Sequence, residues 1–226
     1  MCLRVFYTNL VRLKVQYKKE HNTARMENTL LENTMPATDS DNDIVRRSLD
    51  DPDAFSVIVE RYWNRLFRYV KRISFFTDED TEDILQEIFI KVYRHLNDFD
   101  SDLTFSTWVY RICRNTVIDS IRKKQSRPKT IDIDDKDFSN FFHASTDIAE
   151  EFAIYEHHQK VVTLIESLPL KYREVLVLKF LEDKSYEEIM DIMEKPKGTI
   201  ASLINRGKKI LVDLAHKQGI LTSPQE

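Results

Sequence analysis

Apolar residues recur at intervals of three and four along much of this chain, as they do on one face of an α-helix. In the first half, this spacing predicts one long helix over Ala54–Ile73, a second over Glu82–Leu96 and a third over about Thr104–Lys124. Three candidate N-caps precede the second helix: Thr77, Asp78 and Thr81. The interval Asn97–Leu103 breaks the spacing and is predicted to be a loop.

The same spacing returns in the second half, where it predicts four more helices: Ala149–Ser167, Lys171–Leu181, Ser185–Met193 and Thr199–Lys217. Ser185 stands three residues before Glu188, which is the arrangement of a capping box. With 3 glycines and 6 prolines in 226 residues, the repeated turns of an all-β fold would be hard to supply. We therefore predict an all-α fold.

A stretch without sustained periodicity separates the two helical halves. Eight acidic residues lie in or beside it, with Lys136 as the single Lys or Arg: Asp132, Asp134, Asp135, Asp137, Asp147, Glu150, Glu151 and Glu156. The pattern predicts two helical domains, at 43–127 and 149–219, joined by an acidic linker at 128–148 and followed by a tail at 220–226.

Residues 1–42 form an N-terminal extension outside this pattern. Arg4, Arg12 and Lys14 interrupt its apolar residues, so it lacks the continuous apolar core of a signal peptide. We expect a poorly ordered extension, with Met26 or Met35 as a candidate for the true start. A basic amphipathic helix is the alternative.

The net charge of -4 conceals an uneven distribution of charge. Between Trp108 and Lys129, one acid, Asp119, stands against seven basic residues: Arg111, Arg114, Arg122, Lys123, Lys124, Arg127 and Lys129. The chain therefore presents locally basic faces, which favour contact with the phosphates of a nucleic acid.

The sequence offers little support for catalysis or metal binding. Cys2 and Cys113 are too few and too far apart for a disulfide framework or a zinc site. The adjacent His157 and His158 have no convincing third ligand, and no phosphate-binding glycine loop or nucleophile elbow occurs. No run approaches the roughly 18 to 20 apolar residues of a membrane span. We expect a cytoplasmic protein without catalytic residues, metal, cofactor or direct membrane insertion.

The last two predicted helices are joined by the short segment EKPKG. On a helical wheel, the apolar arc of the final helix holds Ile200, Leu203, Ile204, Gly207, Ile210, Leu211 and Leu214. The opposite arc is polar or small and holds Ala201, Ser202, Asn205, Arg206, Lys208 and Lys209. This pattern is typical of a helix-turn-helix whose second helix enters the major groove of DNA. A helical hairpin with a solvated basic face is the alternative.

Two parts of the chain resemble bacterial RNA polymerase sigma factors. The fourth domain of that family is similar to LPLKYREVLVLKFLEDKSYEEIMDIMEKPKGTIASLINRGKKIL. The second domain is similar to TEDILQEIFIKVYRHLNDF and TFSTWVYRICRNTVIDSIRKK. Both parts stand in the family's order without a third domain between them, and this layout resembles the extracytoplasmic-function (ECF) group. The resemblance covers most of Asp51–Lys217.

The resemblance implies roles for residues of the second domain. Asp83, Gln86 and Glu87 match polar positions whose helix docks on the clamp helices of the polymerase β′ subunit, although carboxylates near a helix N-terminus also favour the helix dipole. The family uses the third helix and the loop before it to open the minus-ten promoter element and hold its non-template strand. The minus-ten binding residues expected here are Arg111, Arg114, Asn115, Arg122 and Lys123. Phe105 and Trp108 are expected to be core residues rather than stacking platforms.

The final helix resembles the part of the family that reads the minus-thirty-five element. The residues expected to bind that DNA are Lys197, Thr199, Ala201, Ser202, Asn205, Arg206, Lys208 and Lys209. The chain departs from the family in the turn, where Glu194 and Lys195 replace a usual Gly and an apolar residue. It also has Ala201 and Leu203 where basic residues are common. Glu194 must therefore form the turn without the conformational freedom of Gly.

The resemblance also implies partners. It implies core RNA polymerase, bound through the β′ clamp helices and the β subunit, together with promoter DNA and an anti-sigma factor. The linker would thread towards the active-site and RNA-exit channels, where a negatively charged strand occupies space shaped for RNA; a solvated spacer is the alternative. Two other hypotheses stay open: a helix-turn-helix regulator that is not a polymerase subunit, and a polymerase-binding decoy that does not read DNA.

Overall fold

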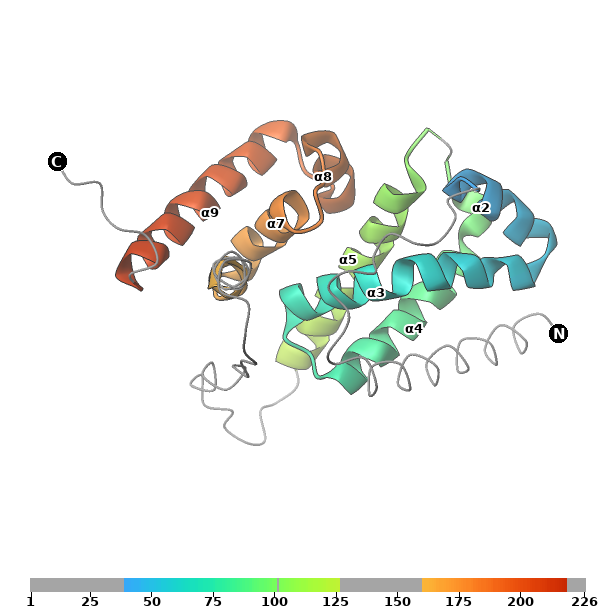
Figure 1. Cartoon of the computed structure of the whole chain (residues 1–226), viewed down its shortest axis with the longest axis horizontal. Helices are drawn as coiled ribbons and strands as arrows, with labels where there is room; N and C mark the ends of the chain where they lie inside the picture. The colour runs from blue at the N-terminus through green and yellow to red at the C-terminus, as the bar shows by residue number, and fades with distance from the viewer. Residues whose placement is uncertain (1–38, 101, 127–159, 219–226) are drawn as a thin grey trace, which may run out of the picture. The chain divides into compact units, whose positions relative to one another are not determined.

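The computed structural model describes residues 39–100, 102–126 and 160–218, and all regular elements within these ranges are helical (Figure 1). The chain divides into two compact units. The N-terminal unit ends at Ile118, within a long helix. The C-terminal unit contains most of the chain after Ile118, with a short segment, Asp191–Glu194, grouped with the first unit. The predicted all-α fold is confirmed.

The N-terminal unit is built from four α-helices: α2 (Asp41–Asp50), α3 (Phe55–Ser74), α4 (Asp78–Arg94) and α5 (Phe105–Ser126), the last as far as Ile118. Two short 3-10 helices, η1 (Pro52–Ala54) and η2 (Leu96–Asp98), lie between them. The three helices predicted for this region are confirmed, but α4 begins at Asp78 rather than Glu82. It begins there because the Thr77 side chain accepts a hydrogen bond from the Asp80 amide and caps the helix.

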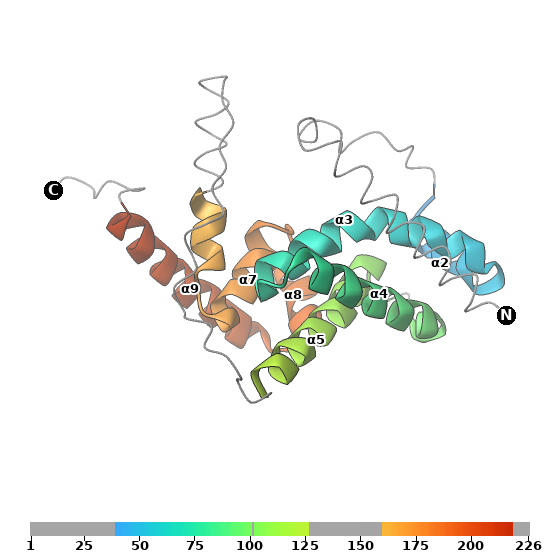
Figure 2. The ribbon, with the colours of Figure 1, turned by 90° about the horizontal axis from the view of Figure 1, so that it is seen from below.

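Helices α3, α4 and α5 lie side by side in the N-terminal unit (Figure 2), and aromatic side chains hold them together. The ring of Trp63 stacks on Phe89 with centroids 5.8 Å apart, which joins α3 to α4. Tyr62 contacts Phe105 at 5.7 Å and Tyr69 contacts Tyr110 at 5.2 Å, so two pairs join α3 to α5. Burial of such rings is the main source of stability for a small helical unit.

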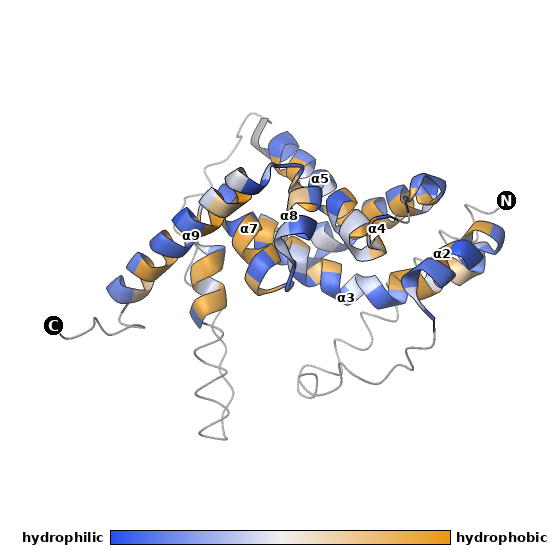
Figure 3. Ribbon diagram, turned by 90° about the horizontal axis from the view of Figure 1, so that it is seen from above, coloured by the Kyte–Doolittle hydropathy of each residue, from blue (hydrophilic) through white to orange (hydrophobic). Residues whose placement is uncertain are grey.

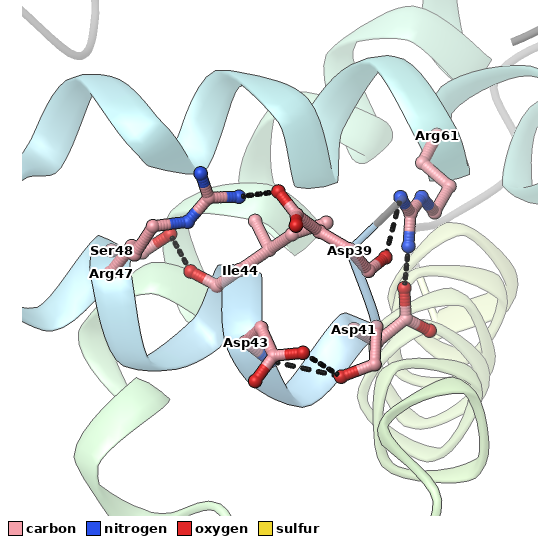
Figure 4. A network of polar contacts seen from close by, with 8 residues as sticks. Asp39, Asp41, Asp43, Ile44, Arg47, Ser48 and Arg61 are labelled. Carbon is pink, nitrogen blue, oxygen red and sulfur yellow. Dashed lines mark hydrogen bonds and ion pairs between the residues drawn. The ribbon is translucent and has the colours of Figure 1, made fainter. Parts of the chain in front are cut away.

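Helix α2 was not predicted, because ten residues give a short apolar pattern and the expected extension ended inside it. Ser40 caps this helix by accepting a hydrogen bond from the Asp43 amide. The Asp41 carboxylate accepts a hydrogen bond from Arg61 of α3 at 2.5 Å (Figure 4). It also accepts one from the Tyr62 hydroxyl of the same helix at 2.5 Å. The N-terminal unit therefore includes residues 39–42, which precede the expected domain start at residue 43.

The C-terminal unit contains α7 (Leu170–Phe180), α8 (Tyr186–Met193) as far as Met190, and α9 (Lys197–Lys217). Residues 160–166 are also helical, and they are the described part of the helix predicted over Ala149–Ser167. Helices α7 and α9 pack closely at Gly207, where a Cβ atom would lie 3.1 Å from the Leu176 side chain. This close approach fixes the position of α9 against the unit's core.

Several expectations concern residues outside the described ranges. They are the extension before residue 39, the acidic linker, the adjacent histidines His157 and His158, and the tail. Among the helices that are described, none combines the length and apolar character needed to span a bilayer.

Candidate nucleic-acid interface

In the turn between α8 and α9, Glu194 occupies the position where the family usually has a Gly. Glu194 adopts a left-handed conformation with φ of 52°, which is the region that usually favours Gly. The Lys195 amide donates to the Met190 carbonyl at 3.2 Å and closes the end of α8. The chain therefore forms a helix-turn-helix connection without a glycine in the turn.

Helix α9 begins at Lys197, after Pro196, rather than at the predicted Thr199. Gly198 therefore lies in the first helical turn, and its backbone is not left-handed. A Cβ atom at this position would meet no atom within 4 Å. The chain changes direction at Glu194 and Pro196, ahead of Gly198.

Helix α8 is fixed at its N-terminus by the predicted capping box. The Ser185 amide donates to Glu188 Oε2 at 2.9 Å, and the Glu188 amide donates to Ser185 Oγ at 3.1 Å. Lys184 is 6% exposed, and its ammonium donates to Glu188 Oε1 at 2.9 Å. Burial alone would raise the pKa of Glu188, but the hydrogen bonds from Ser185 and Lys184 lower it overall.

Hydrophilic and hydrophobic residues alternate along α9 (Figure 3), and nearly all of the residues expected to bind minus-thirty-five DNA are exposed. Those exposed are Lys197, Thr199, Ser202, Asn205, Arg206, Lys208 and Lys209. Ala201 is half-buried, and so is Leu203 on the apolar side. Ile200, Ile204 and Gly207 are buried against the unit's core. The loss of a basic residue at Leu203 therefore widens the packed face of the helix.

Neighbouring side chains restrain two of the lysines on this face. Lys197 pairs with Glu187 of α8 at 3.6 Å. The Lys208 ammonium lies 5.2 Å from the ring centroid of Phe180, at the end of α7. Phe180 is 47% exposed, and sequence reasoning missed it because a single apolar residue at a helix end carries no distinctive signal.

Helix α5 carries the residues expected to bind the minus-ten element. Arg111, Arg114 and Asn115 are half-exposed, whereas Arg122 and Lys123 are exposed. The spacing of Arg111, Asn115 and Arg122 places these three on one face, and the adjacent Lys123 faces another direction. Arg114 donates to Asn115 Oδ1 at 3.2 Å, and Arg122 pairs with Asp119 at 3.6 Å. The structure thus brings together three of the five and places Arg114 next to them.

The loop before α5 presents an aromatic ring that sequence reasoning did not single out. Phe99 is half-buried, and its ring contacts Phe105 at 5.2 Å and Trp108 at 5.5 Å. Phe105 and Trp108 are only 2% and 5% exposed, so the prediction that they are core residues is confirmed. Phe99 therefore forms the outer layer of an aromatic cluster at the N-terminus of α5.

Helix α4 presents the three residues expected to bind core polymerase on its exposed side. Asp83 and Glu87 are exposed and Gln86 is half-exposed, and the spacing of the three places them on one face. Glu87 pairs with Lys91 at 2.8 Å, and Lys91 in turn donates to Thr116 of α5 at 3.2 Å. The polar face of α4 is thereby connected to α5, the helix that carries the residues expected to bind the minus-ten element.

Comparison with known protein families finds a match in each half of the chain. The model of sigma-70 region 2 matches residues 58–127, and the model of sigma-70 region 4 matches residues 158–211. The ECF RNA polymerase sigma-E factor of Escherichia coli K12 is 36% identical over 166 residues, which cover 71% of this chain and 86% of that protein. The chain belongs to the ECF family of RNA polymerase sigma factors.

A second relative of this sigma factor comes from Bacillus subtilis. The ECF RNA polymerase sigma factor SigW of Bacillus subtilis is 36% identical over 167 residues, covering 71% of this chain and 88% of that protein. Sigma factors are non-enzymatic initiation factors, and this protein directs transcription from promoters. Its region 2 match assigns the N-terminal unit, which the hypothesis of a simple helix-turn-helix regulator leaves without a role.

Solved structures show the same fold as this sigma factor. The structure of CnrH in complex with the cytosolic domain of CnrY aligns with a TM-score of 0.57 and 21% identity, covering 79% of this chain and 99% of that one. The sigma factor RpoE in complex with the anti-sigma factor NepR from Bartonella quintana aligns with a TM-score of 0.54 and 20% identity, covering 72% and 96%.

Proposed function

We propose that this sigma factor divides promoter recognition and polymerase binding among three surfaces. The face of α4 with Asp83, Gln86 and Glu87 binds the β′ clamp helices of core RNA polymerase. Helix α5 and the loop before it bind the minus-ten element, and α9 binds the minus-thirty-five element. The observation that carries this proposal is that the region 2 match covers α4 and α5 and the region 4 match covers α9 as far as residue 211, while each of these helices has an exposed polar face.

The minus-ten surface combines the two chemistries that an opened DNA strand requires. The guanidinium groups of Arg111 and Arg122 lie on one face of α5 and suit the phosphates of a single strand. The ring of Phe99 supplies an aromatic surface beside them, on which an unstacked base can pack. Because Phe105 and Trp108 are buried beneath it, Phe99 is the ring in this cluster that is available for stacking.

The minus-thirty-five surface has the shape and chemistry of a recognition helix. Small side chains near its start, such as Ser202, let the helix lie close to base edges in a major groove. Asn205 and Arg206 are exposed in the next turn and are able to form hydrogen bonds with bases or phosphates. Lys208 and Lys209 extend the basic face towards the DNA backbone.

Partners beyond DNA follow from family membership. Core RNA polymerase is the assembly on which a sigma factor acts, and we assign the β subunit as well as β′ to its binding surface. The relation to the RpoE–NepR complex supports an anti-sigma factor as the regulator of this protein. Because its DNA and polymerase are cytoplasmic, we place the protein in the cytoplasm.

Two substitutions test the division between surfaces. Asp83→Ala is expected to weaken binding to core polymerase about tenfold, since it removes one charge at a protein interface. Arg206→Ala is expected to weaken binding of the assembled holoenzyme to a duplex minus-thirty-five element about tenfold, since it removes a groove or phosphate contact. Both affinities are measured for both variants by fluorescence titration.

The matched controls are Asp50→Ala on α2 and Lys171→Ala on α7, which remove exposed charges of the same sign away from the proposed surfaces. Each control is expected to leave both affinities within about twofold of the original protein. Equal losses for Asp83→Ala and Arg206→Ala in the two assays would contradict the proposed division. Stable core binding without promoter binding in the unmodified protein would favour a decoy instead.

A further inference from the structure

The ammonium of Lys91 joins α4 to α5 through a buried hydroxyl. Lys91 lies in the last turn of α4, and its Nζ atom donates to Thr116 Oγ1 of α5 at 3.2 Å. The same ammonium pairs with Glu87, one turn earlier on α4, at 2.8 Å. Thr116 is 3% exposed, whereas Lys91 is half-exposed. The long side chain of Lys91 therefore reaches from the surface of α4 to a buried group on the neighbouring helix.

The hydroxyl of Thr116 is oriented for this contact by its own helix. Thr116 Oγ1 donates its single hydrogen to the Ile112 carbonyl at 2.9 Å. Its lone pairs are then left as acceptors, and the Lys91 ammonium, which has only donors, matches them. The direction of both hydrogen bonds is therefore determined by the groups themselves, and Thr116 links Lys91 to the backbone of α5.

The contact lies on a different side of α5 from the residues expected to bind the minus-ten element. With 3.6 residues per turn, Arg111, Asn115 and Arg122 lie within about 40° of one another around the helix. Thr116 lies roughly 120° from the centre of that group. Lys91 therefore holds α5 without covering its proposed DNA-binding face.

The hydrogen bond also acts on the middle of α5. Ring contacts with α3 involve Phe105 and Tyr110, which lie nearer the N-terminus of the helix. Thr116 follows Tyr110 by six residues, which is more than one turn further along α5. The Lys91–Thr116 hydrogen bond therefore anchors α5 to a second helix, directly beside Asn115 in the sequence.

We propose that Lys91 is a positioning residue for the minus-ten surface: by holding Thr116, it sets where α5 presents Arg111 and Asn115 to the opened strand. This inference rests on the proposed minus-ten function and adds to it a residue that does not itself touch DNA. The Glu87 carboxylate offsets the charge of Lys91, which lowers the cost of holding an ammonium against a buried hydroxyl.

The test compares Thr116→Val with Lys91→Met in holoenzyme containing the full chain. The probe is a single-stranded non-template minus-ten oligonucleotide, taken from a promoter on which the unmodified holoenzyme starts transcription. Valine has the shape of threonine without its hydroxyl, and methionine keeps most of the lysine stem without its charge. Each change is expected to weaken oligonucleotide binding about fivefold, because the groups that contact DNA are displaced rather than removed. The double variant is expected to lose no more than either single variant, because both changes remove the same hydrogen bond.

The salt dependence of binding separates a positioning residue from a direct DNA contact. Both single variants are expected to leave the slope of log affinity against log salt within about 0.3 of the original value, since no phosphate contact is lost. A direct contact between Lys91 and a phosphate would instead make Lys91→Met lower the slope by about 0.7, while Thr116→Val bound like the original protein. That result would overturn the proposal, and so would a double variant in which the two losses multiply.

Ser48→Ala is the matched control. Ser48 is 2% exposed, and its hydroxyl donates to the Ile44 carbonyl at 2.7 Å (Figure 4). This is the same intrahelical hydrogen bond that Thr116 makes, but on α2, outside the minus-ten surface. Ser48→Ala is expected to leave oligonucleotide binding within about twofold of the original, and Thr116→Ser, which keeps the hydroxyl, is expected to do the same. A loss in Ser48→Ala equal to that in Thr116→Val would contradict a specific role for Lys91.

Two further readouts separate positioning from stability and from polymerase binding. Urea unfolding followed by tryptophan fluorescence measures the stability of each variant. If Thr116→Val were destabilised but bound the oligonucleotide like the original protein, the hydrogen bond would have only a structural role and the proposal would fail. The affinity of Thr116→Val for core polymerase is expected to stay within about twofold of the original, and a loss as large as that for the oligonucleotide would also overturn the proposal.

Failure of the underlying function gives a different result. If holoenzyme with the unmodified chain does not bind the oligonucleotide better than core polymerase alone, the minus-ten function itself fails, and the positioning role fails with it. If the unmodified holoenzyme binds and Thr116→Val binds equally well, the positioning role alone fails.

Discussion

Gly207 and Gly198 lie in the same helix but in opposite surroundings. A Cβ atom at Gly207 would meet buried Leu176 side-chain atoms at 3.1 and 3.2 Å, whereas one at Gly198 would meet nothing within 4 Å. Gly207→Ala is therefore expected to destabilise the C-terminal unit by about 1–3 kcal/mol through overpacking. Gly198→Ala is expected to stabilise it by about 0.5–1 kcal/mol, because it reduces the conformational entropy lost on folding.

The two tryptophans allow the units to be followed separately. Trp63 and Trp108 both belong to the N-terminal unit, so their fluorescence in urea reports on that unit, whereas circular dichroism reports on both. The glycine substitutions are expected to move the dichroism transition and leave the fluorescence transition in place. The packing described at α9 would be contradicted if Gly207→Ala shifted the fluorescence transition. It would also be contradicted if Gly207→Ala stabilised the protein as much as Gly198→Ala does.

Tyr62 makes the stability of the N-terminal unit depend on alkaline pH. Burial and its hydrogen bond to Asp41 raise the pKa of the Tyr62 phenol well above the ordinary value of 10. The unfolded chain therefore loses this proton first, so the stabilisation is complete below about pH 10 and is lost as the pH rises further. Tyr62→Phe is expected to cost about 2 kcal/mol at pH 7 and progressively less above pH 10.

Urea unfolding followed by tryptophan fluorescence between pH 7 and 11 checks this expectation, and the difference between the variant and the original protein isolates Tyr62 from the other tyrosines. A difference that stays constant across that range would contradict the assigned hydrogen bond.

Residue roles were predictable where they depended on helical spacing, and not where they depended on contacts. The exposure of Asn205 and Arg206 and the burial of Trp108 follow from their positions on a wheel. The outer position of Phe99, above two buried rings, depends on how a loop folds back on α5. No periodicity encodes such a contact, so the sequence indicated the loop but not the residue.

At the scale of elements, the caps decide where helices begin. Ser185→Ala removes one half of the capping box of α8 and is expected to destabilise the C-terminal unit by about 1 kcal/mol at pH 7. The lowered pKa of Glu188 means that its contribution is present above the ordinary value of 4.5 and is lost as the pH falls. Because the Ser185 side chain is one of the groups that lower this pKa, the effect of Ser185→Ala is expected to shrink in acid.

Urea unfolding followed by circular dichroism at pH 7 and pH 4 measures both effects. Ser202→Ala, the same chemical change at an exposed position of α9, is the control and is expected to change stability by less than about 0.5 kcal/mol. If Ser185→Ala behaved like this control at pH 7, the capping box would not be holding α8.

Element boundaries were least predictable where short polar segments control them. The long apolar stripe of α3 made that helix certain, whereas α2 has ten residues and was missed. Its signal was present in Ser40, a typical N-cap, followed by Asp41 and Asp43 in the first turn. What the sequence does not show is that Asp41 binds α3 as well, which is why α2 is stable despite its length.

At the scale of the whole molecule, helical periodicity and charge distribution predicted the fold class and the kind of partner, whereas the order of two motif blocks indicated the family. Helical periodicity predicted the fold class, and the separation of basic and acidic stretches pointed to a nucleic-acid partner. Neither distinguishes a sigma factor from another helix-turn-helix protein. That distinction came from the order of two motif blocks, and the matches at 58–127 and 158–211 confirm it. The acidic linker between them lies outside the described residues.

The central claim is that this protein gives core RNA polymerase the ability to start transcription at specific promoters. The most direct measurement is in vitro transcription by purified core polymerase on a promoter library, with and without the full chain, followed by sequencing of transcript 5′ ends. We expect transcripts that require the protein and whose start sites share common minus-ten and minus-thirty-five elements. The absence of any such transcript above core polymerase alone, in a sample free of inhibitor, would contradict the account.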